Sequence, residues 1–318
     1  MIDQNLVELS IVVPIYNEKE NVEEFIRRIV PILSANTRSY EIIFAIDPST
    51  DGTEKTIASL AQQNSHVKGL VFSRRFGQPT ATLAGLEYCK GNSAIVMDVD
   101  LQDPPELIPE MLEKWREGFE VVRAKRKHRY GETRIKLVVA KFGYVVINRF
   151  SEVKIPRDTG DFRLIDRKVI DQLKRFPEAH GFLRGLVALV GYKQTEVLFD
   201  RPTRFSGKGN YNRYLGSLRF QFNGLFGFST ALLNLATVTG FITAFLSFIF
   251  GSIYVVAQIV GNNFPVGNPT IVFLVLLIGG IQLICLGIIG QYIGRIYDEV
   301  KRRPRFIVSE TIGDLDTK

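Results

Sequence analysis

Short apolar runs alternate with amphipathic segments over the first hundred residues. Runs of strand length, rich in β-branched and aromatic residues, occupy residues 9–16, 40–46, 67–72 and 94–97. Between the first two runs, apolar residues recur at helical spacing, at Val22, Phe25, Ile26, Ile29, Val30 and Leu33. Further helices are predicted after the polar turn 47–53 and near 80–89. This alternation predicts an α/β domain, with a mostly parallel sheet covered by helices on both faces.

Two longer apolar stretches, residues 231–260 and 270–293, lie near the C-terminus. Each exceeds the ~20 residues that a helix needs to cross a bilayer. No charged residue occurs between Arg219 and Arg295. A buried core hairpin of a water-soluble protein is disfavoured by this length and lack of charge. The pattern predicts two transmembrane helices joined by the uncharged turn 261–269.

The charges that flank these helices predict their orientation. Basic residues precede the first helix and follow the second, at Arg201, Arg204, Lys208, Arg213 and Arg219, and at Arg295, Lys301, Arg302, Arg303 and Arg305. The positive-inside rule then predicts a multi-pass integral membrane protein with both termini in the cytoplasm. The first apolar run is too short and interrupted for a signal peptide.

The same features divide the chain into four parts. We expect a cytosolic catalytic domain over 1–210, an interfacial amphipathic segment over 211–229, the membrane hairpin over 230–294 and a cytosolic basic tail over 295–318. The basic apolar segment 134–149 fits a membrane-surface helix and a core helix equally well.

Charge and small motifs exclude several functions. The net charge of +7 suits an anionic membrane face or anionic substrates. No nucleic-acid-binding motif occurs, so no nucleic-acid partner is expected. Neither a Gly-x-Gly-x-x-Gly after the first strand nor a Gly-Lys-Ser/Thr loop is present, which disfavours dehydrogenases and P-loop enzymes. The two cysteines, Cys89 and Cys285, form no disulfide framework.

The most informative polar residues follow the fourth predicted strand. Asp98 and Asp100 come directly after it, with Gln102 and Asp103 close behind. Their oxygens suit Mg²⁺ or Mn²⁺, which keeps open positions for substrate phosphates. An ordinary acidic turn is the alternative. Asp47 follows the second strand, and ligands of such sheets bind beyond the carboxyl ends of the strands.

Six short motifs occur in order, at residues 11–18, 47–53, 75–77, 97–105, 159–164 and 182–186. With them the whole chain resembles the inverting family-2 glycosyltransferases, in the branch of dolichyl-phosphate mannose synthase and the bacterial bactoprenol glucosyl transferases. The resemblance implies a Rossmann-like, nucleotide-sugar-binding head of GT-A type with a C-terminal transmembrane hairpin. One departure is Asp47-Pro48-Ser49, where the family often has Asp-Asp-Gly-Ser, so the sugar-nucleotide pocket is expected to differ locally.

The resemblance also implies roles for individual residues. The nucleotide-sugar pocket would contain Pro14, Tyr16, Glu18, Asp47 and Asp98. Asp100 and Gln102 would hold Mg²⁺ or Mn²⁺, and the catalytic residues would be Asp158, Asp161 and Asp100. The acceptor phosphate would contact Arg201, Arg204, Lys208 and Tyr211.

Simpler roles remain open for some of these side chains. Glu18 could cap the first helix, and Asp161 could pair with Arg163 or Arg184. The basic cluster from Arg123 to Arg129 could bind anionic lipid or the acceptor phosphate.

The activity implied by the resemblance is transfer of a hexose, with inversion, to a polyprenyl (undecaprenyl) phosphate, giving a lipid-linked sugar for cell-envelope or protein glycosylation. UDP-glucose is the favoured donor and GDP-mannose the alternative. The second phosphate pKa of ~6 leaves the acceptor largely dianionic, so Asp158 and Asp161 are expected to position more than to deprotonate.

Other classes fit less well. A processive synthase is excluded because Trp115, the only tryptophan, lies outside a Gln-x-x-Arg-Trp motif. An inactive nucleotide-sugar sensor conflicts with the retained Asp98 and Asp100. The Gly290-x-x-x-Gly294 spacing predicts close helix packing, either within the hairpin or, as we expect, in a homo-oligomer.

Overall fold

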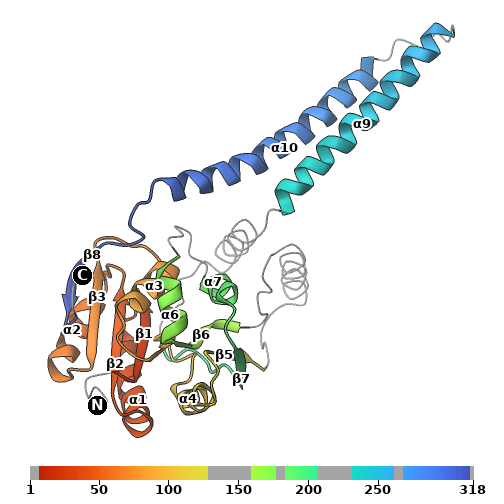
Figure 1. Ribbon diagram of the computed structural model, residues 1–318. Helices are drawn as coiled ribbons and strands as arrows, with labels where there is room; N and C mark the ends of the chain where they lie inside the picture. The colour runs from red at the N-terminus through yellow and green to blue at the C-terminus, as the bar shows by residue number, and fades with distance from the viewer. Residues whose placement is uncertain (1–6, 128–158, 177–182, 207–230, 261–267, 316–318) are drawn as a thin grey trace.

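The computed structural model describes residues 7–127, 159–176, 183–206, 231–260 and 268–315 (Figure 1). Several predictions fall outside these ranges. They concern Asp158, Lys208, Tyr211, the segment 134–149 and the interfacial segment 211–229.

An eight-stranded mixed sheet forms the centre of the head, in the order β7-β5-β6-β4-β1-β2-β3-β8. Its strands are β1 (Leu9–Ile15), β2 (Tyr40–Ile46), β3 (Val67–Phe72), β4 (Ser93–Val96), β5 (Val121–Arg126), β6 (Thr159–Asp166), β7 (Gln194–Phe199) and β8 (Val308–Ile312). Strands β4, β1, β2 and β3 are parallel, as the alternating pattern predicts. Strand β6 runs antiparallel to both β4 and β5, which the local pattern did not reveal.

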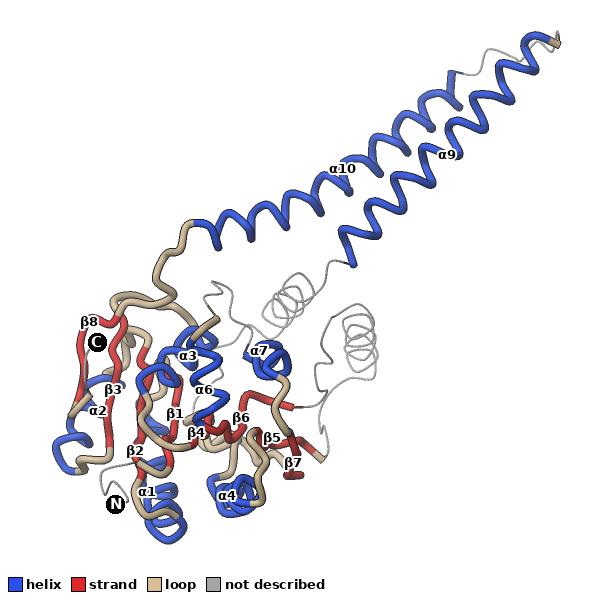
Figure 2. Tube along the Cα trace, viewed as in Figure 1, coloured by secondary structure: helices blue, strands red, loops and turns tan. Residues whose placement is uncertain are grey.

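Helices cover both faces of this sheet (Figures 1 and 2). One face packs against α1 (Lys19–Asn36), α2 (Thr53–Gln63) and α4 (Ile108–Arg116), the last preceded by the short 3₁₀ helix η1 (Pro105–Leu107). The other face packs against α3 (Gln78–Tyr88), α6 (Arg167–Lys174) and α7 (Leu183–Val190). In α1 the predicted apolar stripe is the buried one, because Val22, Phe25, Ile29 and Leu33 are all fully buried. The three layers confirm the α/β prediction.

Two long helices, α9 (Ala231–Ile259) and α10 (Asn268–Val300), extend side by side away from the head (Figures 1 and 2). At 1.5 Å per residue each is longer than the ~30 Å hydrocarbon core of a bilayer. Their large apolar side chains face outward, and Phe241 and Phe248 are each 74% exposed. Leu232–Ile253 and Phe273–Val300 are long and apolar enough to cross a membrane by length and composition. A lipid environment would cover this surface.

The chain beyond α10 contains a strand that the sequence pattern did not predict. Residues 308–312 form strand β8, which pairs antiparallel with β3 at one edge of the sheet. The charge pattern predicted only a cytosolic basic tail over 295–318, because a single short edge strand leaves little periodic signal. The chain therefore leaves the head, forms the two long helices and returns to the same sheet.

Candidate active site

The carboxyl ends of the parallel strands β1, β2 and β4 lie together, and three acidic side chains follow these strand ends. We call this region the carboxyl edge of the sheet. Glu18 follows β1, Asp47 follows β2 and Asp98 follows β4, and these strands are parallel neighbours. Pro14 is buried within β1 and Tyr16 lies half-buried directly after it. The residues that the sequence assigned to the nucleotide-sugar pocket are therefore neighbours in space, as expected for an open α/β sheet.

The turn after β4 folds back on itself and gathers three carboxylates. Leu101, at its centre, has a φ of +60°, an uncommon conformation for a residue with a side chain. Burial of the Leu101 side chain compensates for this backbone conformation. The Gln102 N–H donates to Asp100 Oδ1 at 3.0 Å, and the Asp98 N–H donates to Asp103 Oδ2 at 3.1 Å. The turn thus holds Asp98, Asp100 and Asp103 together.

Crowding among these carboxylates changes their protonation. Burial, together with the nearby charges of Asp103, Asp100 and Asp161, raises the pKa of Asp98 well above its usual value. Burial, opposed by the Asp98 N–H and by Arg201, raises the pKa of Asp103 to about 6. Asp98 and Asp103 therefore hold their protons more tightly than isolated aspartates, and a bound cation would favour their ionised forms.

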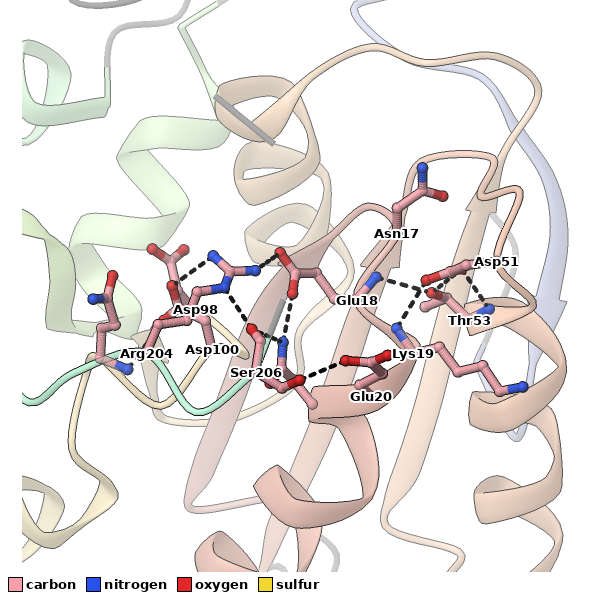
Figure 3. Close-up of polar contacts among 12 residues, drawn as sticks. Asn17, Glu18, Lys19, Glu20, Asp51, Thr53, Asp98, Asp100, Arg204 and Ser206 are labelled. Atoms are coloured by element: carbon pink, nitrogen blue, oxygen red, sulfur yellow. Dashed lines mark hydrogen bonds and ion pairs between the residues drawn. The ribbon is translucent and has the colours of Figure 1, made fainter. Parts of the chain in front are cut away.

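Arg204 lies between two of the predicted site residues (Figure 3). Its Nη1 is 3.2 Å from Asp100 Oδ2 and its Nη2 pairs with Glu18 Oε1. Its Nε donates to the Ser206 carbonyl at 2.7 Å. The arginine assigned to the acceptor phosphate therefore contacts the carboxylate assigned to the metal, although 104 residues separate them.

Glu18 has a role other than the helix cap that was its alternative. It is the residue before α1, but its side chain accepts no capping hydrogen bond from the helix. Its carboxylate instead accepts from Asn21 Nδ2 at 2.6 Å and pairs with Arg204. Glu18 therefore faces the site.

Asp161 is held by two arginines, as its simpler alternative proposed. Arg184 Nε donates to Asp161 Oδ1 at 2.9 Å, and Arg163 Nη2 is 3.8 Å from the same oxygen. Burial alone would raise the pKa of Asp161, but Arg184 and Arg163 outweigh it and the pKa is lowered. Burial also lowers the pKa of Arg163 to about 10. Asp161 is thus ionised and fixed in place.

Asp47 is engaged by a loop that the sequence analysis only partly recognised. Its two oxygens accept the N–H groups of Phe76 at 2.8 Å and Gly77 at 2.9 Å. Gln78, the next residue, donates from Nε2 to Asp98 Oδ1 at 2.9 Å. Sequence reasoning missed Gln78, and its only signal was its place directly after the Arg75-Phe76-Gly77 motif.

The other predicted phosphate contacts are placed less closely. Arg201 is exposed but close enough to influence the charges of Asp98 and Asp103. In the alternative basic cluster, Lys125 pairs with Glu196 at 2.7 Å and Arg123 is half-buried in β5. Arg129 lies outside the described residues.

A divalent cation fits this site only together with a substrate. Within the described residues, no three His, Cys, Asp or Glu side chains are arranged to hold a metal ion. Mg²⁺ is, however, commonly bound by one or two carboxylates and the phosphates of a substrate. Asp100, with the neighbouring Gln102, supplies this kind of partial oxygen site.

Comparisons with known proteins cover about half of the chain in the case of a family model and nearly all of it in the case of two relatives. The model of the family "Glycosyl transferase family 2" matches residues 10–174. An uncharacterized glycosyltransferase of Synechocystis is 46% identical over 308 residues, covering 96% of each chain. The bactoprenol glucosyl transferase of Shigella phage SfII is 37% identical over 306 residues, covering 96% of this chain and 98% of that protein.

Among solved structures, a glucosyl-3-phosphoglycerate synthase from Mycobacterium tuberculosis, in complex with Mn²⁺, UDP and glucosyl-3-phosphoglycerate, matches with a TM-score of 0.46 and 19% identity. The match covers 68% of this chain and 76% of that one. A likeness at this level bears on neither the metal nor the substrate of the present chain.

Proposed function

Because this chain belongs to glycosyl transferase family 2, we propose that it transfers glucose from UDP-glucose to a polyprenyl phosphate, with inversion at the anomeric carbon. The head has the GT-A type of glycosyltransferase fold, as the motifs predicted. The glucosyl group and the lipid acceptor follow the name of the phage relative, which is similar over nearly full length, and the UDP carrier is our own proposal. The product would be a lipid-linked glucose.

The contact of Arg204 with Asp100 and Glu18 is the observation that supports this function best. Arg204 belongs to the segment that leads from the head toward α9, so it joins the polar edge of the sheet to the membrane side of the chain. A lipid phosphate must meet a nucleotide sugar at such a junction. Arginine suits this task because its guanidinium binds phosphate oxygens in a bidentate manner.

The reaction replaces one bond at the anomeric carbon with another. A phosphate oxygen of the acceptor forms a bond to this carbon while the bond to the UDP oxygen breaks on the opposite side. A dianionic phosphate has no proton to lose, so no strong general base is needed. Asp161, kept ionised by Arg184 and Arg163, would orient the reactants.

The side chains of the carboxyl edge have complementary roles. Asp98 and its partner Gln78 would contact the sugar or ribose, and Pro14, Tyr16, Glu18 and Asp47 would shape the nucleotide pocket. Mg²⁺ or Mn²⁺, held by Asp100 and Gln102 when bound, would stabilise the negative charge that develops on the diphosphate. Arg201, Arg204, Lys208 and Tyr211 would hold the acceptor phosphate.

The membrane arrangement belongs to the same proposal. We place α9 and α10 across the bilayer with the head and both termini in the cytoplasm, in keeping with the basic flanks of the hairpin.

Among the described residues, a Cβ at Gly290 or Gly294 would meet no atom within 4 Å, so α9 does not pack on this glycine face of α10. We propose that the face joins protomers of a homo-oligomer. Cross-linking in native membranes tests this, and a fully active monomer would contradict it.

A donor and acceptor screen tests the function directly. The full chain in mild detergent is given radiolabelled UDP-glucose or GDP-mannose, undecaprenyl phosphate and Mg²⁺ or Mn²⁺. We expect label from UDP-glucose in the lipid fraction. Transfer from GDP-mannose alone would identify GDP-mannose as the donor. If neither nucleotide sugar is transferred but one still binds, the inactive nucleotide-sugar sensor would be favoured instead.

A further inference from the structure

The C-terminal tail, residues 301–315, contacts the head where β3 ends. Strand β8 pairs antiparallel with β3, and in Figure 1 it is the blue strand beside β3. Just before β8, the Ile307 carbonyl accepts the Ser73 N–H at 3.0 Å. Ser73 is the first residue after β3, so the tail holds the start of the segment that connects β3 to α3.

Phe306 of the tail packs into an aromatic group at the same place. Its ring centroid lies 5.9 Å from that of Phe72 and 6.2 Å from that of Tyr88. Phe72 in turn lies 5.9 Å from Phe76. Arg305 adds an ion pair with Glu87 of α3 at 3.6 Å. The tail thus contacts both β3 and α3. Residues 73–78, which connect these two elements and include the first residue of α3, are called the donor loop.

The donor loop touches three of the residues assigned to the nucleotide-sugar pocket. Its N–H groups at Phe76 and Gly77 hold both oxygens of Asp47. The Arg75 guanidinium lies 3.8 Å from the centre of the Tyr16 ring. Gln78 donates to Asp98 at 2.9 Å. A shift of this loop would therefore disturb several pocket residues at once.

We infer that residues 305–307, at the start of the tail, are a positioning element of the donor site and that Phe306 is its main positioning residue. This inference rests on the proposed function, since it concerns how the nucleotide sugar is bound. Without Phe306 the donor loop would populate more conformations, and donor binding would have to order it. Only residues 301–307 separate α10 from β8, so the membrane anchor is joined closely to the element that shapes the pocket.

A matched pair of tail variants tests the inference. Phe306→Ala removes the contact with Phe72 and Tyr88. Ile312→Ala removes an apolar side chain at the other end of β8, where Ile312 faces Gly69 and lies away from the donor loop. Phe306→Tyr keeps an aromatic ring and serves as the rescue variant. All three are made in the full-length chain in mild detergent.

We expect Phe306→Ala to raise the KM for UDP-glucose by about tenfold, because the lost ordering must be supplied by binding. The KM for undecaprenyl phosphate should stay within about twofold, because the tail does not touch Arg204. Phe306→Tyr should restore the donor KM, and Ile312→Ala should leave it unchanged. Hydrogen exchange should accelerate in peptides covering 73–78 for Phe306→Ala only.

The outcomes separate this inference from the function on which it rests. An active wild type whose Phe306→Ala variant keeps both its donor KM and its exchange in 73–78 would overturn the inference alone. Equal rises in donor KM for Phe306→Ala and Ile312→Ala would also overturn it, since they would indicate a general loss of stability. A wild type that transfers from no nucleotide sugar would overturn the proposed function, and the inference with it.

Discussion

The parallel strands carry buried charge at both of their ends, which we call the amino edge and the carboxyl edge of the sheet. The charged groups at these two ends have different roles. At the amino edge, where the strands begin, Glu41 of β2 pairs with Lys68 of β3 at 2.9 Å. Glu41 also accepts from the Ser10 hydroxyl at 2.7 Å and from the Lys90 N–H at 2.6 Å. Its side chain is only 1% exposed. One carboxylate is thus matched by one ammonium group and further hydrogen bonds.

At the carboxyl edge, acidic groups are crowded rather than matched. Asp98, Asp100 and Asp103 share one turn, and burial with mutual repulsion raises the pKa of Asp98. Arg204 reaches this edge from a distant segment and divides its contacts between Asp100 and Glu18. The contrast teaches that a carboxylate with its own buried partners stabilises the fold, whereas crowded carboxyl groups with raised pKa values mark a candidate site for ligands.

Substitution at Asp100 should produce the largest effect. Asp100→Asn should lower turnover by about 10³-fold, because it removes the carboxylate assigned to the cation on the leaving diphosphate. The melting temperature should change little, since Arg204 keeps Glu18 as a partner. Initial rates of lipid glucosylation measure the first effect and thermal unfolding the second.

Chelation provides the control for this first prediction. Excess EDTA should abolish transfer by the wild type, and added Mn²⁺ or Mg²⁺ should restore it. Undiminished transfer in EDTA, or full activity of Asp100→Asn, would contradict a metal at the carboxyl edge.

Substitution at the amino edge should lower stability and leave turnover nearly unchanged. Glu41→Ala leaves the Lys68 ammonium buried without its partner, which should lower the free energy of unfolding by about 3 kcal/mol. Turnover per folded molecule should remain near that of the wild type, since Glu41 is far from the pocket. Chemical denaturation and active-site titration provide the two measurements.

A double variant sharpens this second test. Glu41→Met combined with Lys68→Met replaces the ion pair with apolar side chains and should be less destabilised than Glu41→Ala. If Glu41→Ala instead unfolds normally but loses turnover, the amino edge is part of the site and the contrast between the edges fails.

Arg204 tests the link between the carboxyl edge and the lipid. Arg204→Ala should lower kcat/KM for the polyprenyl phosphate by roughly 10- to 150-fold, equivalent to about 1.5–3 kcal/mol for a charge-assisted contact. Arg201→Ala should act in the same direction. Steady-state kinetics with varied undecaprenyl phosphate provide the measurement.

Arg28 offers a matched control, because it forms a surface ion pair at 2.6 Å with Glu106, which is not one of the predicted site residues. Arg28→Ala should change neither kcat nor the KM for undecaprenyl phosphate, since exposed ion pairs contribute little to stability. Unchanged acceptor kinetics in both Arg204→Ala and Arg201→Ala would move the phosphate site, with the Arg123 to Arg129 cluster the next candidate.

The smallest expected effect concerns pH. Arg184 and Arg163 hold the pKa of Asp161 below its ordinary value despite burial. In Arg184→Ala the burial effect is less opposed, so the pKa of Asp161 should rise. Protonation would then remove the ionised form as pH falls, and kcat/KM should decline at a higher pH than in the wild type.

Arg175, an exposed arginine that bonds Gln172, is the control for this last test. Arg175→Ala should keep the wild-type pH profile of kcat/KM. An acid limb that does not move in Arg184→Ala would show that ionised Asp161 is dispensable for transfer.

Local sequence patterns predicted much of the fold. The stripe from Val22 to Leu33 predicted the buried face of α1, and the apolar runs at 40–46 and 67–72 match β2 and β3 residue for residue. Such patterns are readable because helix and strand periods repeat within a few residues. Asp98 and Asp100 were found for a similar reason, since they follow directly after their strand.

The strand in the C-terminal tail and the contact of Gln78 were harder to predict from the sequence. Strand β8 was expected as a basic tail, and the side-chain contact of Gln78 with Asp98 was missed. A short edge strand has no period long enough to detect, and a side-chain contact between segments has no local signature. Only the neighbouring Arg75-Phe76-Gly77 motif pointed to this part of the chain.

By itself, the sequence determined the α/β head, the two membrane-length helices, the glycosyltransferase family and the acidic turn after β4. These features depend on residues close together in the chain, whose spacing reports local geometry. The tertiary structure alone decided that Arg204 lies between Asp100 and Glu18, 186 residues from the latter, and that the tail returns to β3. Which charges meet depends on strand order and on how distant segments pack, and neither is written in any short stretch of the chain.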